Sequence, residues 1–463
     1  MRNSIMDINL RPYLRPDGRA RYLAIAEAIQ NAFIAGHLQP GMRLPTHREL
    51  AADLRVSVQT ISRAYSQAEK LGVVHGVIGS GTYVSSYSPD QETEFFQSGH
   101  PETASNPIDL SIAHPVCTKR HLQIVRDAMI RLAQSDNDQY LLKFRPVSGL
   151  AEHVAAGQHW LQGQGLPAHH DNIVLCNGTA HGLMLALASI VNPGETIACE
   201  ELVDHGFIAL ARTLNFRLTG LPIDDDGLIP EALEVACRES RLRILCCTPS
   251  LNNPTGSLMP RKRREQIAAI ARRYDLLVVE DDVFGALEAN RCPPLASLIP
   301  ERTFYATSFT KTVLPGLRAG YLVIPDCFRK QVIAHLTAST WMATPITFEL
   351  VSDLIRENLL DSMIFTQQDE LASRQSLARS LLPEALVGGS PFGMHIWLAL
   401  PDEMTSQDMM ARCREQGVLV TPCQQFCPNP RLAPRRVRVS LGAEAFRPRL
   451  QEGLQIVRNI IEA

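Results

Sequence analysis

The stretch from residue 276 to residue 318 decides the fold of most of the chain, and its sequence is LLVVEDDVFGALEANRCPPLASLIPERTFYATSFTKTVLPGLR. It contains two short runs of apolar and β-branched residues, Leu276–Val279 and Thr303–Ala306, and both are typical of buried strands. The acidic triplet Glu280-Asp281-Asp282 ends the first run. Ser308-Phe309-Thr310-Lys311 follows the second run, and Arg318 lies seven residues beyond the lysine. A carboxylate at the end of a buried strand is costly unless it meets a cation or solvent, so the triplet marks a candidate site.

The same alternation continues on both sides of this stretch. Further apolar runs, separated by helical patterns, occur at Ile173–Cys176, Ile244–Cys247 and Ala319–Ile324. This order predicts an α/β fold with a mostly parallel sheet covered by helices. After a long helical stretch near 346–382, a smaller α+β unit is predicted from three more runs, Met394–Leu400, Val418–Thr421 and Arg436–Leu441.

Two turns of this region carry residue types that bind ligands. Asn177-Gly178-Thr179-Ala180 follows a predicted strand and opens a helix, where backbone amides can hold a phosphate. Asn253-Pro254-Thr255-Gly256 follows another strand. Each motif alone is better explained as an ordinary turn, and a single lysine is most often a solvated surface residue.

The N-terminal part has a different pattern. Residues 22–35 carry apolar side chains at helical spacing, and Thr46-His47-Arg48-Glu49 is a capping box that opens a second helix. Ser57 is placed to cap a third helix, and residues 73–84 alternate around glycines as in a β-hairpin. Two short helices at a tight turn followed by a hairpin predict a winged helix-turn-helix over residues 12–86. The polar residues 87–107 are expected to be a linker, and residues 108–463 form the body, with a large part near 108–345 and a small part near 346–463.

Charge and composition restrict the function. The 463 residues carry a net charge of −3, but residues 1–88 have a balance of +4 and the remainder −7. A basic head on an acidic body suggests a polyanionic partner, although a solvated basic face would have the same composition. The sequence has no apolar run long enough for a membrane span and no apolar signal-peptide core, so we expect a cytoplasmic protein without a membrane partner. Eleven cysteines spread over this length favour reduced thiols, and Cys423 and Cys427 lack the further ligands of a zinc site, so no metal is expected.

In the third helix, Ile61, Ala64, Tyr65 and Ala68 form an apolar stripe, so the opposite side faces outward. In a winged helix-turn-helix the start of this helix enters the major groove, and neighbouring basic residues and the wing contact phosphates. The candidate DNA-binding residues are Arg43, Thr46, Arg48, Ser57, Val58, Gln59, Thr60, Arg63, Gly79 and Ser80. The alternative is a small helical domain with a solvated polar face.

Residues 36–84 resemble the DNA-binding head of GntR-type bacterial regulators. The residue after the Ser57 cap is often arginine in that family, whereas it is Val58 here. Base recognition is then expected to depend on Gln59, Thr60 and Arg63, with Val58 able to contact a thymine methyl group.

The body resembles fold-type I aminotransferases over about 108–460. The resemblance rests on the order of the motifs: a glycine-containing phosphate turn, Asn-Pro-Thr-Gly, a strand-end aspartate, Ser-x-x-Lys and a downstream arginine. It extends to Val437-Arg438-Val439, where the family keeps a carboxylate-binding arginine. A GntR-type head joined to such a body is similar to the MocR class of regulators, which implies a homodimer that binds a double-stranded DNA operator.

The resemblance also implies pyridoxal 5′-phosphate (PLP) as cofactor and a role for each motif. Lys311 would form the Schiff base as the catalytic lysine, Asp281 would face the pyridine nitrogen, and Asn253 would donate to the phenolic oxygen. Arg438 would bind the carboxylate of an amino acid effector. The phosphate would be held by the amides of Gly178 and Thr179, the Ser308 hydroxyl and Arg318.

Two positions depart from the family pattern. Val283-Phe284 stand where the family has a tyrosine, and Asp204 falls where an aromatic residue stacks on the cofactor, with His205 beside it. These changes weaken the expectation of efficient transamination more than that of cofactor binding. The leading hypothesis is therefore a PLP-dependent transcriptional regulator that senses PLP, an amine or an amino acid through an aldimine at Lys311. The alternatives are an active PLP-dependent aminotransferase with an accessory head and a DNA-binding protein whose body holds no cofactor.

Overall fold

The computed structural model describes residues 10, 12, 20–34, 38, 42–70, 73–77, 81–84, 107–136, 138–240, 242–288 and 291–463. The chain divides into two compact units, residues 1–103 and 104–463, which are described separately. The expected wing residues Gly79 and Ser80, and the expected linker except residue 107, lie outside the described residues.

The first unit contains three helices and a two-stranded antiparallel hairpin. These elements are α1 (Arg21–Ile34), α2 (His47–Leu54), α3 (Val58–Lys70), β1 (Val74–Val77) and β2 (Gly81–Val84). The predicted capping box of α2 is confirmed, because the Glu49 amide donates to Thr46 Oγ1 at 3.3 Å and the Thr46 amide donates to Glu49 Oε2 at 2.8 Å. The predicted stripe of α3 is buried and packs on the apolar side of α1.

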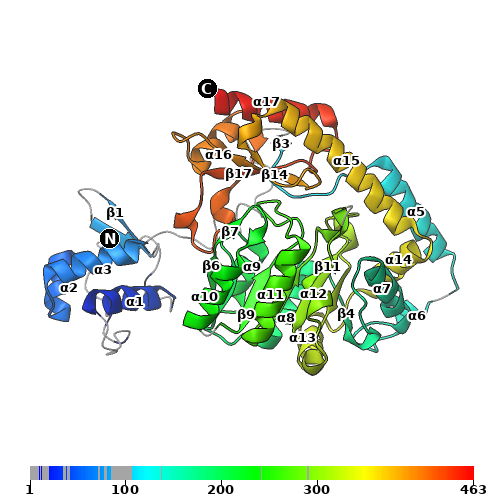
Figure 1. Cartoon of the computed structure of the whole chain (residues 1–463), viewed down its shortest axis with the longest axis horizontal. Helices are drawn as coiled ribbons and strands as arrows, with labels where there is room; N and C mark the ends of the chain where they lie inside the picture. The colour runs from blue at the N-terminus through cyan, green and yellow to red at the C-terminus, as the bar shows by residue number, and fades with distance from the viewer. Residues whose placement is uncertain are drawn as a thin grey trace, which may run out of the picture. The chain divides into compact units, whose positions relative to one another are not determined.

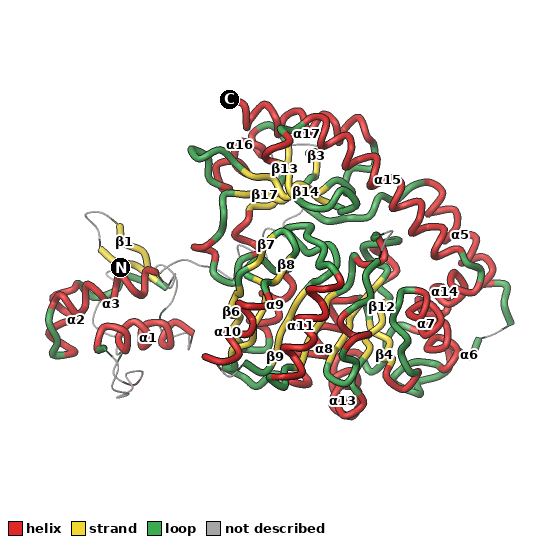
Figure 2. Tube along the Cα trace, viewed as in Figure 1, coloured by secondary structure: helices red, strands yellow, loops and turns green. Residues whose placement is uncertain are grey.

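A seven-stranded sheet forms the centre of the second unit (Figures 1 and 2). Its order is β4-β12-β11-β10-β9-β5-β6, and all neighbours are parallel except that β12 is antiparallel to both β4 and β11. The strands are β4 (Ile173–Cys176), β5 (Thr196–Glu200), β6 (Arg217–Leu221), β9 (Ile244–Cys247), β10 (Leu277–Asp281), β11 (Thr303–Ser308) and β12 (Gly320–Val323).

Helices cover both faces of this sheet, and successive residues of one strand reach opposite cores. On β10, Val279 packs with α8, α9 and α13, whereas Val278 packs with α10, α11 and α12. The helices of this part are α5 (Lys119–Ala133), α6 (Gln139–Leu142), α7 (Ala151–Gly163), α8 (Thr179–Ile190), α9 (His205–Thr213), α10 (Pro230–Ser240), α11 (Arg261–Arg273), α12 (Leu295–Leu298), α13 (Arg329–Thr340) and α14 (Pro345–Arg356). Short 3-10 helices and a small hairpin complete it: η2 (His170–Asn172), η3 (Gly285–Leu287), η4 (Pro315–Leu317), η5 (Asp326–Phe328), β7 (Ile223–Asp224) and β8 (Gly227–Leu228).

The long helix α15 (Leu359–Leu381) connects this large part to a smaller C-terminal part. Its first half contributes Leu360 and Met363 to the core beside α7 and α14, and its second half contributes Ala378 to the core of the small part. The small sheet has the order β13-β14-β17-β16. Its elements are η6 (Glu384–Leu386), β13 (Val387–Gly388), β14 (His395–Ala399), α16 (Ser406–Glu415), β15 (Val418–Leu419), β16 (Thr421–Pro422), η7 (Cys423–Phe426), η8 (Pro430–Leu432), β17 (Arg436–Ser440) and α17 (Arg447–Glu462).

The predicted strands agree with this architecture, with small shifts. The bounds of β4 and β9 are those predicted, whereas β10 extends beyond its apolar run to include Glu280 and Asp281. The predicted strand 418–421 divides in two, because Val418–Leu419 pairs with β3 (Ile108–Asp109) and Thr421–Pro422 pairs with β17. Among the described residues, no helix is long and apolar enough to cross a membrane.

Candidate functional site

The carboxyl ends of four sheet strands bring the sequence motifs to one edge of the large sheet. The turn 177–179 follows β4, Asn253 lies in the loop after β9, Asp281 ends β10 and Ser308 ends β11. Ligands of open α/β sheets bind at this edge, because loops and helix N-termini converge there.

Lys311 lies half-buried at this edge, beside charges of both signs. Its Nζ donates a hydrogen bond to the Ala113 carbonyl at 2.5 Å. Burial lowers the pKa of Lys311 to about 8, with Arg438 and Arg318 acting in the same direction and Asp204 and Asp281 opposing it. A lysine in this state has an appreciable neutral fraction near neutral pH, which is what a nucleophilic amine requires.

A cluster of hydroxyl, guanidinium and amide donors surrounds the start of α8. The Thr179 hydroxyl donates to Ser308 Oγ at 2.8 Å, and Ser308 Oγ donates to Thr310 Oγ1 at 3.2 Å. Gly178 caps the helix with φ of 88°, and a Cβ there would lie 3.1 Å from the Arg318 guanidinium. Thr310 belongs to the motif that follows β11, but the sequence predicts no role for it. Its position two residues after Ser308 is the signal that could have identified it as a site residue.

The acidic triplet at the end of β10 divides among three surroundings. Glu280 accepts hydrogen bonds from the Leu295 and Ala296 amides at 3.0 and 2.9 Å. Asp282 pairs with Arg291 and accepts from the Tyr305 hydroxyl at 2.5 Å. Asp281 accepts a hydrogen bond from the local Val283 amide at 3.1 Å. Burial, helped by the nearby carboxylates, raises the pKa of Asp281 well above its usual value.

Arg438, on β17 of the small part, reaches the same edge through Asn253. Its side chain is 1% exposed; Nη1 donates to Asn253 Oδ1 at 2.9 Å, and Nη2 donates to the Ser111 carbonyl and to Thr421 Oγ1. The guanidinium lies 4.8 Å over the Phe426 ring, and its Nε has no hydrogen-bond partner among the described residues. Arg438 is therefore desolvated and its Nε is an unpartnered donor among the described residues, and burial lowers its pKa to about 10.

Asp204 completes a chain of contacts with Asn253 and Arg438. Asn253 Nδ2 donates to Asp204 Oδ2 at 2.5 Å, and Asp204 Oδ1 caps α9 by accepting from the Gly206 amide at 2.7 Å. Burial acts to raise the pKa of Asp204, but His205, these hydrogen bonds and Arg438 lower it below its usual value. Asp204, which the sequence identifies only as a departure from the family pattern, is therefore an anion within the site.

Phe284 and His205, the other residues at the two departing positions, make ring contacts. Phe284 is 2% exposed and meets the His395 ring edge-on at a centroid distance of 6.2 Å. His205 meets Phe426 in the same manner at 6.3 Å.

Glu200 is a positioning residue that the sequence did not reveal. Its carboxylate, at the end of β5, accepts from the Thr248 amide and from Asn252 Nδ2, both at 3.0 Å. These bonds fix the loop that carries Asn253. Glu200 ends a strand that mixes polar and apolar residues, so no sequence pattern distinguishes it as a site residue.

In the first unit, the predicted DNA-facing residues lie on the surface. Val58 is 47% exposed, Gln59 and Arg63 are exposed, and the same holds for Arg43, Thr46 and Arg48. Ser57 caps α3 by accepting from the Thr60 amide at 3.1 Å, and the two hydroxyls lie 2.8 Å apart. Arg43 lies against the hairpin, since a Cβ on Gly81 would approach its Nε to 2.9 Å.

These features define two classes at once: a winged helix-turn-helix, and an aminotransferase-like α/β domain with a half-buried lysine at the carboxyl edge of its sheet. Residues 105–456 match the family model described as aminotransferase class I and II, and the chain belongs to this family. Residues 21–84 match the model described as bacterial regulatory proteins, gntR family. The combination makes the chain a MocR-type transcriptional regulator, as the sequence predicted.

Similar proteins have the same organisation. The chain is 27% identical over 441 residues to YdeF of Bacillus subtilis, an uncharacterized HTH-type transcriptional regulator, covering 95% of this chain and 94% of YdeF. It is 26% identical over 409 residues to PtsJ of Salmonella typhimurium, the vitamin B6 salvage pathway transcriptional repressor, covering 87% and 90% of the two chains.

Solved structures confirm the fold of the second unit. An archaeal alanine:glyoxylate aminotransferase superposes with a TM-score of 0.72 at 18% identity, covering 81% of this chain and 94% of the other. LysN, an α-aminoadipate aminotransferase of Thermus thermophilus complexed with N-(5′-phosphopyridoxyl)-L-leucine, superposes with a TM-score of 0.70 at 21% identity, covering 80% and 96%.

Proposed function

We propose that this cytoplasmic regulator binds PLP at Lys311, responds to an amine or amino acid there, and binds a double-stranded DNA operator through its first unit. The observation that carries the proposal is the half-buried Lys311, whose pKa is lowered to about 8, beside Asp281, Arg318 and Arg438. PLP, when bound, supplies an electrophilic carbonyl and an electron-withdrawing ring.

The residues at the sheet edge fit this cofactor. The hydroxyls of Thr179, Ser308 and Thr310, the Arg318 guanidinium and the amides at the start of α8 form a donor set suited to a phosphate dianion. Gly178 keeps this cradle open, because a side chain there would crowd Arg318.

Asp281 and Asn253 would hold the ring of the cofactor. The raised pKa of Asp281 indicates a carboxylate that lacks sufficient stabilisation, which a protonated ring nitrogen would supply. The Asn253 amide, which donates to Asp204 in this structure, would donate to the phenolic oxygen of the bound cofactor.

Asp204 and Arg438 together suit a zwitterionic effector. Arg438 has its Nε free for a carboxylate, and Asp204 presents an anion for an ammonium group. An effector that bound these groups would compete with the Asn253 bridge between them, which gives the ligand a way to favour one arrangement of the large and small parts.

An active aminotransferase remains the second candidate, because Lys311 has the pKa of a group able to accept and return a proton. Phe284 brings no hydroxyl to the site and Asp204 no stacking ring, and both favour sensing over turnover. A turnover assay with amino acids and keto acids distinguishes them: sustained multiple turnover would support the enzyme, and none with specific operator binding would support the regulator.

The surface of the large part favours a homodimer. Helices α5, α6 and α14 pack together, and near them Leu142, Phe144 and Ile346 are 71%, 75% and 50% exposed. Side chains of this kind gathered on one surface mark an interface. A two-fold dimer would match two operator half-sites.

Borohydride reduction followed by peptide mapping tests the cofactor assignment. After incubation with PLP and reduction, we expect the label on the peptide that contains Lys311, none in Lys311→Ala, and full labelling in Lys330→Ala, whose lysine is exposed. A wild-type protein that leaves Lys311 unlabelled would overturn the proposal and favour a cofactor-free body.

A further inference from the structure

A cluster of metal-ligating side chains lies at the amino end of β4. Its members, His169, His170 and Asp171, are consecutive in the sequence, and the last two belong to η2. One nitrogen of each imidazole and one carboxylate oxygen all lie within 4.8 Å of one another. The four residues of β4, which span roughly 13 Å, separate the cluster from the turn 177–179 at the other end of the strand. The cluster is therefore distinct from the site around Lys311.

The distances within the cluster fit a tetrahedral metal site better than direct pairing of the side chains. Asp171 Oδ2 lies 3.5 Å from His169 Nδ1 and 3.5 Å from His170 Nε2. A hydrogen bond between an imidazole and a carboxylate would be shorter, about 2.7–3.2 Å. Ligand atoms that each lie about 2.1 Å from a tetrahedral metal are about 3.4 Å apart, which is close to both distances. His169 Nδ1 also accepts a long hydrogen bond of 3.4 Å from the Asp171 amide, and a metal would replace it.

The backbone that carries the cluster is held on both sides, whereas its side chains are open to solvent. The Ala168 carbonyl accepts from Gln158 Nε2 at 2.9 Å, and the Asn172 carbonyl accepts from the Ile324 amide at 2.9 Å. The three side chains of the cluster are between 57% and 65% exposed. A metal ion can therefore reach them from solvent, and small side-chain rotations on a fixed backbone complete the geometry.

The donor set determines the kind of ion. Mg²⁺ and Ca²⁺ prefer oxygen ligands, whereas zinc and the neighbouring first-row metals also bind imidazole nitrogen. Two imidazoles and one carboxylate therefore favour an ion of the zinc type. Three protein ligands leave the fourth tetrahedral position to water, as in zinc sites that keep an open position.

We propose that His169, His170 and Asp171 form a surface site for a divalent transition metal ion of the zinc type, with water as the fourth ligand. Each imidazole binds through the nitrogen that lies 3.5 Å from the carboxylate, and Asp171 binds through Oδ2. The expectation that no metal binds rests on the pattern of cysteines and does not concern these residues.

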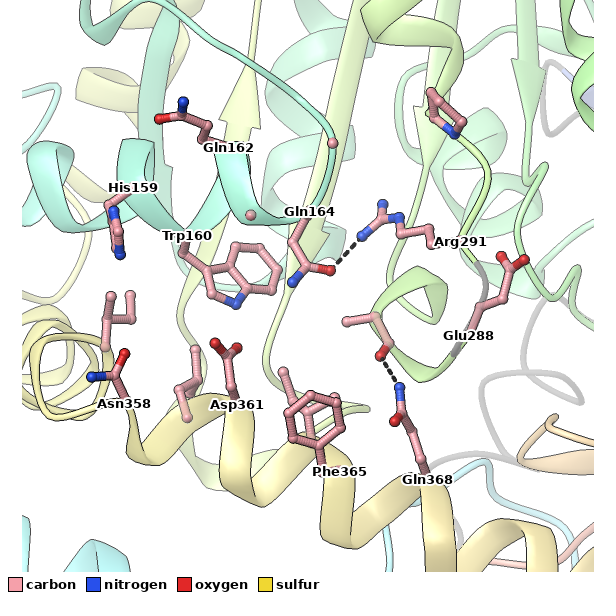
Figure 3. A pocket seen from close by; sticks show the side chains of 17 residues that line it. His159, Trp160, Gln162, Gln164, Glu288, Arg291, Asn358, Asp361, Phe365 and Gln368 are labelled. Atoms are coloured by element: carbon pink, nitrogen blue, oxygen red, sulfur yellow. Dashed lines mark hydrogen bonds between the residues drawn. The ribbon is translucent and has the colours of Figure 1, made fainter.

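The metal would stiffen the connection between α7 and β4. This connection begins at the cavity that α7 and α15 line, where Gln164 accepts a hydrogen bond from Arg291 at 2.7 Å (Figure 3). It ends at η2, which contributes two of the three metal ligands. Because the metal binds only the folded arrangement of these ligands, it opposes local opening of this connection.

Equilibrium dialysis against Zn²⁺ tests the site in the full-length protein, without a histidine tag or added PLP and with a thiol-free reductant. We expect the wild type to bind about one more equivalent of Zn²⁺ than His169→Ala, His170→Ala and Asp171→Asn. The affinity at this site should be at least about tenfold weaker in each variant, since loss of an outer-shell partner alone costs that much. His159→Ala is the matched control, because His159 is exposed on α7 and does not belong to the cluster.

Cobalt absorbance identifies the ligands, because the eleven cysteines could also bind zinc. We expect Co²⁺ to give visible bands that the three cluster variants lose and His159→Ala keeps, without the near-ultraviolet charge-transfer band of a thiolate ligand. The proposal is overturned if cluster variants with native circular dichroism bind Zn²⁺ like the wild type, or if the cobalt spectrum is that of a thiolate site. The three residues would then be a solvated surface cluster. Lys311 takes no part, so its failure to capture PLP would refute the cofactor assignment and leave this result unchanged.

Discussion

The rate at which Lys311 captures PLP should rise with pH through a midpoint near 8, and Asp204→Asn should move that midpoint downward. Burial lowers the pKa of Lys311 from 10.5 to about 8, whereas the anionic Asp204 raises it. Removing the negative charge of Asp204 therefore destabilises the ammonium form further, and the neutral amine appears at lower pH. Asparagine keeps the capping oxygen that α9 needs, so the helix is retained.

The expected size of the effect follows from the two pKa values. At pH 7 a lysine with a pKa of about 8 is neutral in about a tenth of the molecules, and one with a pKa of 10.5 in about one in 3000. The structure therefore gives Lys311 a roughly 300-fold larger reactive fraction at pH 7 than an exposed lysine. In Asp204→Asn the neutral fraction of Lys311 at pH 7 should be larger still, so Lys311 should capture PLP faster at that pH.

Stopped-flow absorbance measures this capture when cofactor-free protein is mixed with PLP over a range of pH. Lys311→Ala should show no protein-dependent phase, and Lys330→Ala should follow the wild type. Comparing the variants with the wild type cancels the titration of PLP itself. A wild-type midpoint near 10.5, or an upward shift in Asp204→Asn, would refute the assignment of charges around Lys311.

Three further perturbations address the DNA-binding unit and the remaining site residues. Arg63→Ala should weaken binding to DNA selected from a random pool by about 1–3 kcal/mol and relax its sequence preference, as fluorescence anisotropy would show; equal weakening on all sequences would make Arg63 a phosphate contact. Arg438→Ala should remove the response to carboxylate-bearing amines yet leave PLP bound, and loss of PLP absorbance would show that Arg438 is misassigned. Gly178→Ala should weaken PLP binding in equilibrium dialysis, because φ of 88° and the nearness of Arg318 both oppose a side chain; unchanged affinity would exclude Gly178 from the phosphate cradle.

The sequence predicts the fold best where a strand is buried on both faces. Ile173–Cys176 and Ile244–Cys247 are completely buried, so each appears as an uninterrupted apolar run and its bounds are predicted correctly. The strands β5 and β6 were not predicted. β6 lies at the edge of the sheet and mixes exposed and half-buried residues, which leaves Arg217–Leu221 without an apolar run.

The order of the motifs along the chain was enough to suggest which residues gather at the sheet edge, because carboxyl ends of parallel strands meet there. The network around Asp204 was not predictable in the same way. Asn253 and Arg438 are 185 residues apart, and their contact depends on how the small part packs on the large one. The cavity that α7 and α15 line likewise depends on the packing of helices far apart in the sequence, which no local pattern encodes.

The triplet at the end of β10 makes this strand intolerant of changes in length. Side chains alternate along a strand, so Glu280 and Asp282 share one side and Asp281 has the other to itself. Deleting a single residue upstream would turn each carboxylate to the opposite side of the sheet. Asp281 would then lie on the side where Glu280 now binds α12 and Asp282 now binds Arg291. We therefore expect a single-residue insertion or deletion within this strand to disrupt the site.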